Sequence, residues 1–281
     1  MSVFTYEDYT GNVYRLRKRI LVTIFSQPFP LNAGDDRYLE KRMMEDRHGY
    51  RSDVDAGYLQ DLFKRIHYPE TADVRLKNRL RKDEIKQYIK DLGSSQECLE
   101  YDTFFFAFLT YLSCENTGST VYRDERIHLD DGLCPLQDIY DEVKNVEAMR
   151  MKPKVFLIQA DDISLLFPIQ YIKGEKIVKP LKIPQDADRL VIMSDIPQRF
   201  ANRSRETEEK NPSFLIKAFC DSLVENSQRS TENRLDLLSL TTVINNKVRV
   251  RIGELNKAGV ERAKDMHVPL VTSTLTKLVT I

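Results

Sequence analysis

Residues 152–162, KPKVFLIQADD, decide the fold. The segment PKVFLIQA within them, at residues 153–160, is short and is continuously apolar from 155 to 158 (VFLI). Such a run is typical of a strand whose two faces are both covered by other elements. We therefore expect a buried strand here, followed directly by the acidic residues Asp161 and Asp162.

Strand and helix patterns alternate through the first half of the chain. Strands are predicted at 20–25 (ILVTIF), 103–113 (TFFFAFLTYLS) and 153–160. Between them, apolar residues recur at helical spacing in segments 52–63, 81–93 and 135–148. Ser52 or Asp53 is the expected N-cap of the first helix, Gly93 the expected stop of the second, and Pro135 the expected first residue of the third. This alternation predicts an α/β domain with a mostly parallel sheet.

The second half repeats the same alternation. A strand is predicted at 187–196, helices at 212–226 and 235–252, and a final extended strand at 267–281. Residues 163–182 contain two Pro, one Gly and four Lys and are predicted to connect the halves. Residues 31–51 are highly charged and are predicted to form a long loop.

Composition excludes several classes of protein. Lys and Arg number 43 and Asp and Glu number 43, so the chain has no basic surplus for binding nucleic acid. Neither an apolar signal segment nor an apolar run of about 18 residues occurs, so we expect no membrane span and a cytoplasmic location. The cysteines are scattered, which favours reduced thiols over a disulfide framework or a zinc site. The four histidines lie in polar or loop contexts without metal-ligand spacing, so neither metal nor cofactor is expected.

Several ordered segments together resemble the caspases, the cysteine proteases that cleave after aspartate. They are 52–59 (SDVDAGYL), 112–113 (LS), 152–160 (KPKVFLIQA), 183–192 (IPQDADRLVI), 214–223 (FLIKAFCDSL), 240–248 (LTTVINNKV) and 268–278 (VPLVTSTLTKL). The resemblance implies a three-layer sandwich, with a six-stranded, mostly parallel central sheet and helices on both faces. It also divides the chain into a short N-terminal extension (1–19), a large-subunit-like region (20–162), a linker (163–182) and a small-subunit-like region (183–281). The linker has no Asp, so we expect it to stay uncleaved.

The residues that the family uses for chemistry are replaced. Where the family reads Gln-Ala-Cys-Arg-Gly, residues 159–163 read Gln-Ala-Asp-Asp-Ile, so Asp161 stands at the nucleophile position. Where the family reads Ser-His-Gly, this chain has Cys114 at the histidine position and Glu115 at the oxyanion glycine. A carboxylate is a poor base for a thiol, and neighbouring aspartates keep a thiol protonated. We therefore expect no peptidase activity, and we interpret Cys114 as a small buried side chain.

The pocket that binds the substrate aspartate in the family is retained only in part. Gln159 matches its glutamine and Arg203 its small-subunit arginine, whereas the first arginine is either Arg47 or the nearby Arg51. Arg203 is either a surviving ligand or an ion-pair partner of Asp161. Asp161 and Asp162 are expected to be solvated or ion-paired and to repel an acidic substrate, which makes substrate trapping weak.

The resemblance also implies a partner. In the family, small subunits pair through the segment that corresponds here to Val268, Pro269, Leu270, Val271, Thr272, Ser273, Thr274 and Leu275. The leading hypothesis is a non-catalytic homologue that inhibits or activates an active caspase by heterodimerisation, in apoptosis or a related pathway. The alternative is a homodimeric interaction scaffold. A third possibility is an enzyme of new chemistry that uses Asp161, Asp162 and Cys114. These residues do not, however, supply a nucleophile, a general base and an oxyanion site together.

Overall fold

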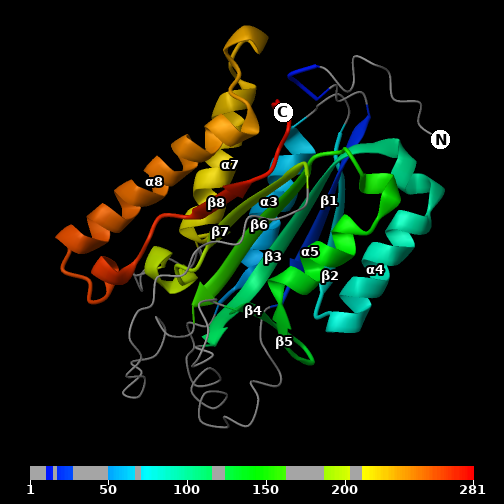
Figure 1. Ribbon diagram of the computed structural model, residues 1–281. Coiled ribbons are helices and arrows are strands. Elements are labelled where there is room, and N and C mark those ends of the chain that lie inside the picture. The colour runs from blue at the N-terminus through cyan, green and yellow to red at the C-terminus, as the bar shows by residue number, and fades with distance from the viewer. Residues whose placement is uncertain are drawn as a thin grey trace.

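The computed structural model describes residues 11–14, 18–27, 50–66, 71–115, 124–162, 187–202 and 211–281, without the side chains of 113–115 and 124. These residues form three layers, with helices packed on both faces of one twisted sheet (Figure 1). The loop predicted at 31–51 lies almost entirely outside the described residues, and so does the linker at 163–182. The layered α/β architecture confirms the expected fold class.

The main path of the sheet has the order β2-β1-β3-β6-β7-β8. Its strands are β2 (Asp73–Asn78), β1 (Arg19–Ser26), β3 (Tyr101–Glu115), β6 (Lys154–Asp162), β7 (Arg189–Ser194) and β8 (Leu270–Ser273). All neighbours on this path are parallel except β8, which runs antiparallel to β7. β6 therefore lies inside the sheet, between β3 and β7, as its unbroken apolar run predicts.

Among the described residues the sheet has eight strands, two more than expected. The additional strands are β4 (Asp124–Leu129), which pairs with the end of β3, and β5 (Gly132–Pro135), which pairs with β4. Both are short and join through a tight turn at Asp130 and Asp131. Charged residues interrupt the apolar pattern of β4, and for that reason the sequence does not predict it.

The helices form two layers (Figure 1). They are α3 (Ser52–Arg65), α4 (Lys82–Ser94), α5 (Leu136–Lys144), α7 (Phe214–Ser227) and α8 (Leu237–Lys257). Short 3-10 turns are η1 (Gln96–Glu100), η2 (Glu147–Met149), η3 (Gln198–Ala201), η4 (Thr231–Asn233) and η5 (Ala263–Asp265). α3, α7 and α8 bury their apolar residues on one face of the sheet, and α4 and α5 bury theirs on the other.

Strand β3 supplies both halves of the core. Phe105 and Leu109 point to the α3–α7–α8 layer, whereas Phe104, Phe106 and Phe108 point to the α4–α5 layer. Successive side chains of a strand face opposite sides of the sheet, so a continuously apolar strand packs against two layers at once. This explains the aromatic density of the segment.

The predicted helix ends need correction. α3 begins at Ser52, so neither Ser52 nor Asp53 is its N-cap; Ser52 is buried and accepts a hydrogen bond from Ser26 Oγ at 2.8 Å. Gly93 does not end α4, because Ser94 is still helical. A Cβ at Gly93 would lie 2.5 Å from Val146 Cγ1, so the glycine instead allows α4 and the segment after α5 to approach closely.

Two further boundaries differ from the prediction. α5 begins at Leu136, because the preceding Pro135 still pairs with β4 as the last residue of β5. Within 267–281, only Leu270–Ser273 forms a strand with β7, although Leu278 makes an isolated parallel bridge with Val13. None of the helices within the described ranges has the length and apolar character needed to cross a membrane.

Candidate functional site

The carboxyl end of β6 is the position to which the resemblance assigns the nucleophile. In the β3–β6 register Tyr111 lies opposite Asp161 and Leu112 opposite Asp162. Beyond that point β3 no longer pairs with β6 and is paired with the antiparallel strand β4, with Cys114 opposite Glu125. The strands that carry positions 114 and 161 are therefore neighbours, although the side chains of Cys114 and Glu115 are outside the described part.

The side chain of Asp161 is buried, with 1% of its surface exposed. Its Oδ2 accepts the backbone N–H of Gln198 at 3.0 Å, and its Oδ1 accepts Gln159 Nε2 at 3.0 Å. The expectation that Asp161 is solvated is therefore wrong, whereas its ion pairing with Arg203 stays a prediction, because Arg203 lies outside the described residues. One donor, Gln159, lies on the same strand, whereas the other, the Gln198 N–H, comes from a segment 37 residues away.

Gln159 is likewise turned into the protein and is fully buried. Its Nε2 donates to Asp161 and to the carbonyl oxygen of Ile196, the latter at 2.9 Å, so both amide hydrogens are used. Its Oε1 has no hydrogen-bond partner among the described residues. The glutamine that matches the substrate pocket therefore has no hydrogen left for a ligand in this conformation.

A buried carboxyl on α3, Asp55, organises the surroundings of the site. Its Oδ1 accepts the backbone N–H of Ser213 at 2.8 Å and Gln198 Nε2 at 3.4 Å. Its Oδ2 accepts the hydroxyl groups of Tyr50, at 2.9 Å, and of Ser213. Asp55 therefore ties the beginning of α7 and η3 to α3. Sequence reasoning missed this residue, although a polar side chain on the same helix face as Leu59 and Leu62 was a signal.

Burial changes the acidity of both carboxyl groups. The loss of hydration raises the pKa of Asp161 well above its usual range, against the lowering effect of the Gln198 and Gln159 hydrogen bonds. The negative charge of Asp55 raises the pKa of Asp161 further. Burial raises the pKa of Asp55 to about 6, although its donors act in the opposite direction. Two carboxyl groups of unusual pKa therefore lie in one buried network.

The candidate arginines are only partly described. Arg47 and Arg203 lie outside the described residues, so neither the expected pocket role nor the alternative Arg203–Asp161 pair is tested. Arg51 is described, and its guanidinium binds Asp53 at 2.6 Å on the surface. Its backbone N–H donates to Gln198 Oε1 at 2.8 Å. In this structure the Arg51 side chain points to solvent and away from the buried network.

The other titratable residues of note in the described part are three cysteines and a histidine. Cys98, Cys134 and Cys220 are buried free thiols. His128 is buried on β4, contrary to the expected polar or loop context, and burial lowers its pKa to about 4. Within the described ranges, no group of His, Cys, Asp and Glu is arranged to hold a metal ion.

The predicted pairing segment lies at the edge of the sheet. β8 is the last strand of the path and contacts β7 on one side (Figure 1). Val268 and Leu270 are 40% and 43% exposed, whereas Pro269 is buried. The segment therefore presents a strand edge with exposed apolar side chains.

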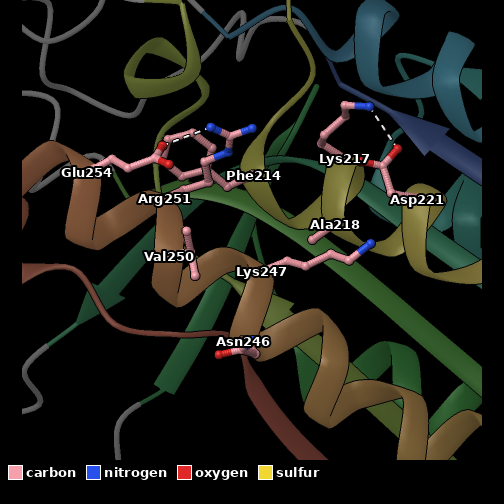
Figure 2. A pocket seen from close by; sticks show the side chains of 9 residues that line it. All are labelled: Phe214, Lys217, Ala218, Asp221, Asn246, Lys247, Val250, Arg251 and Glu254. Atoms are coloured by element: carbon pink, nitrogen blue, oxygen red, sulfur yellow. Dashed lines mark hydrogen bonds and ion pairs between the residues drawn. The ribbon is translucent and has the colours of Figure 1, made fainter.

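A separate hollow lies between α7 and α8 (Figure 2). Its apolar lining comes from Phe214, Ala218 and Val250. Around it Lys217 pairs with Asp221 at 2.7 Å and Arg251 with Glu254 at 2.8 Å. These charges are matched within the chain, and the lining residues take no part in the Asp161 network.

The three-layer sandwich, with neighbouring strands β3 and β6 ending at one site and β8 at the edge, defines a caspase-like fold. A family model described as the caspase domain matches residues 34–280. The chain belongs to the caspase family.

Many solved structures are similar to this chain, and two of them are caspase-1 structures. The structure titled "structure of pro-sf-caspase-1" is 20% identical with a TM-score of 0.66, and the match covers 97% of this chain and 99% of that one. The crystal structure of caspase-1 from Spodoptera frugiperda is 19% identical with a TM-score of 0.62, covering 99% of this chain and 95% of that one. A comparison with curated proteins finds no match. At these identities the structural similarity shows the fold.

Proposed function

We propose that this chain is a non-catalytic caspase homologue that regulates an active caspase by pairing with it through the β8 edge. The observation that carries the pairing is the position of β8, which contacts β7 on one side and leaves Leu270 43% exposed. An exposed strand edge is a template for a strand of another chain, and a shared two-fold axis extends one sheet into the other. The setting that we propose is the cytoplasm, in apoptosis or a related pathway.

Three features support the absence of peptidase activity. Asp161, at the nucleophile position, is buried and holds a backbone N–H, so its carboxyl group is unavailable to a substrate carbonyl. A caspase mechanism needs a thiolate nucleophile and a histidine that transfers protons. This sequence has Asp161 at the nucleophile position and Cys114 at the histidine position. Gln159 donates both of its amide hydrogens to acceptors within the protein, Asp161 and the carbonyl oxygen of Ile196.

Pairing is tested by size-exclusion chromatography with light scattering, on the protein alone and mixed with an active caspase. Leu270→Asp places a charge on the β8 edge and is expected to abolish the mixed dimer. Leu133→Asp is the matched control, since Leu133 is also a strand residue and is 37% exposed. Equal dimerisation by both variants would overturn the proposed surface. A stable dimer of this chain alone, with no mixed species, would instead favour the homodimeric scaffold.

Enzymatic activity is tested with an Asp-containing fluorogenic peptide. We expect no turnover by the purified protein. Cleavage that is lost on Asp161→Ala would show that the chain is an enzyme of a different chemistry.

A further inference from the structure

Asp188, the residue before β7, has a left-handed backbone conformation, with φ at 63°, although it is not a glycine. Its backbone N–H donates to the carbonyl oxygen of Thr274 at 2.9 Å, and its carbonyl oxygen accepts the N–H of Lys154 at 2.8 Å. An aspartate in this conformation is uncommon and is kept where the surrounding structure fixes it. Asp188 therefore joins the first residue of β6 to the segment that leaves β8.

The Asp188 side chain, which is 4% exposed, accepts hydrogen bonds from two distant segments of the chain. Its Oδ1 accepts the Thr276 hydroxyl at 2.5 Å and the Thr276 N–H at 3.3 Å. The same oxygen accepts the hydroxyl of Tyr14, which precedes β1. One carboxyl oxygen therefore connects the N-terminal segment with the segment that follows β8.

The backbone of segment 12–14 also binds the C-terminal segment. The Tyr14 N–H donates to the carbonyl oxygen of Leu278 at 3.0 Å, and the Leu278 N–H donates to that of Asn12 at 2.9 Å. Val13 and Leu278 form the isolated parallel bridge, and each is 46% exposed. A bridge of one residue pair at the surface opens easily. The Tyr14 hydroxyl, which binds a buried carboxyl group, therefore provides an attachment that the exposed bridge lacks.

β8 is a short edge strand whose end depends on these bonds. Only Leu270–Ser273 pairs with β7, and the next residue, Thr274, donates its N–H to the carbonyl oxygen of Arg189 at 2.8 Å. A strand of four residues makes few ladder bonds, so its local stability depends on how the flanking segments are held. Segment 12–14 and Asp188 therefore support the strand from beyond its end.

We propose that Tyr14 is a positioning residue for the pairing edge. Its hydroxyl acts through Asp188, which in turn holds Thr276 and the end of β8. The N-terminal segment is then part of the support of the pairing surface, so a change at Tyr14 alters a strand at the other end of the chain. The effect on pairing rests on the proposed function, whereas the support of β8 is measured on the isolated protein.

The test is hydrogen exchange with mass spectrometry on the isolated full-length protein, in a peptide that spans 268–279. Loss of one hydrogen bond should raise its exchange by about fivefold in Tyr14→Phe, which keeps the ring. Peptides from β3 and α4 should keep the wild-type rate, because a general loss of stability would raise exchange throughout the protein. Tyr58→Phe removes the hydroxyl of a tyrosine that is 39% exposed on α3, and this matched control should change neither rate.

Two variants of Asp188 separate its side chain from its backbone. Asp188→Asn keeps an acceptor oxygen, and asparagine tolerates the left-handed conformation, so exchange of 268–279 should stay within about twofold of the wild type. Asp188→Gly keeps the conformation but removes the acceptor, so it should raise exchange at least as much as Tyr14→Phe. Combining the glycine variant with Tyr14→Phe should add less than about twofold, because the hydroxyl acts through this carboxyl group.

The consequence for pairing is tested by mixing the same variants with an active caspase, in size-exclusion chromatography with light scattering. We expect Tyr14→Phe to weaken the mixed dimer by about threefold or more, because a less ordered edge must be fixed on binding. Asp188→Asn should leave the mixed dimer intact. An unchanged mixed dimer in Tyr14→Phe would overturn the link between Tyr14 and pairing.

The exchange measurement decides the role of Tyr14 separately from the proposed function. That role is overturned if 268–279 exchanges equally in Tyr14→Phe and the wild type, or if Tyr14→Phe has its full effect on top of Asp188→Gly. A wild type that forms no mixed dimer would contradict the proposed pairing, while the exchange result would still decide whether Tyr14 supports β8.

Discussion

Gln198 and Asp161 meet through one buried hydrogen bond, from the Gln198 N–H to Asp161 Oδ2 at 3.0 Å. The residue at the position of a protease nucleophile thus serves as an acceptor for the backbone of a distant loop. Replacing Asp161 therefore changes the architecture of the site as well as its chemistry.

Restoring the family residues is predicted to give little activity. In the triple variant Asp161→Cys, Cys114→His, Glu115→Gly, the Gln198 N–H loses its carboxyl acceptor, which costs about 1–3 kcal/mol. Gln159 still donates to Ile196, so the substrate pocket remains incomplete. Hydrolysis of an Asp-containing fluorogenic peptide should stay near background in a sample whose fold is verified by circular dichroism. Robust turnover would show that only the directly reacting residues had been lost.

The pH dependence of stability is predicted from Asp55. Its folded pKa of about 6 lies above the ordinary value of 3.8, so the folded chain holds this proton more tightly than the unfolded chain does. The associated stability is complete below pH 3.8 and is lost as the pH rises to about 6. At about 1.4 kcal/mol per pKa unit, the loss is roughly 3 kcal/mol.

Asp55→Asn removes this titration and leaves a side chain that fits the site. Its oxygen accepts the same two N–H groups, and its amide donates to the hydroxyl groups of Tyr50 and Ser213, which can reverse. Urea unfolding at pH 4 and pH 7 should therefore show a smaller loss of stability for Asp55→Asn than for the wild type. Identical losses would contradict the raised pKa.

Close packing at Gly93 predicts a second stability effect. In Gly93→Ala the new methyl group meets Val146 Cγ1 at 2.5 Å, and overpacking of this kind costs about 1–3 kcal/mol. Gly57→Ala is the matched control, since nothing lies within 4 Å of its Cβ on α3, and it should stabilise the helix by about 0.5–1 kcal/mol. Both values come from urea denaturation. If the loss of stability in Gly93→Ala persists when Val146 is also changed to Ala, then the loss comes from a contact other than Val146.

The sequence predicts the elements whose signal is local and continuous. β3 and β6 follow from unbroken apolar runs, and α4 follows from the helical spacing of Ile85, Ile89 and Leu92, which the structure buries. β2 and β5 are short and partly exposed, so they lack such a run. Ser52 has the residue type of an N-cap, but its hydroxyl bonds to Ser26 on a neighbouring strand.

The candidate site is less predictable because its bonds join distant parts of the chain. The position of Asp161 follows from the resemblance, but its burial depends on the N–H donated by Gln198. The burial of Asp55 likewise depends on Ser213, which lies 158 residues later in the chain. Residue-type reasoning treats an aspartate as solvated, and only the folded chain reveals which backbone donors replace water.

The most direct measurement is the rate at which an active caspase cleaves a peptide as this protein is added. We expect no turnover by this protein alone, and a saturable rise or fall in the caspase rate. Leu270→Asp should abolish the change and Leu133→Asp should leave it intact. A caspase rate that is unaffected at concentrations well above that of the enzyme, or peptide cleavage by this protein alone, would contradict the proposed function.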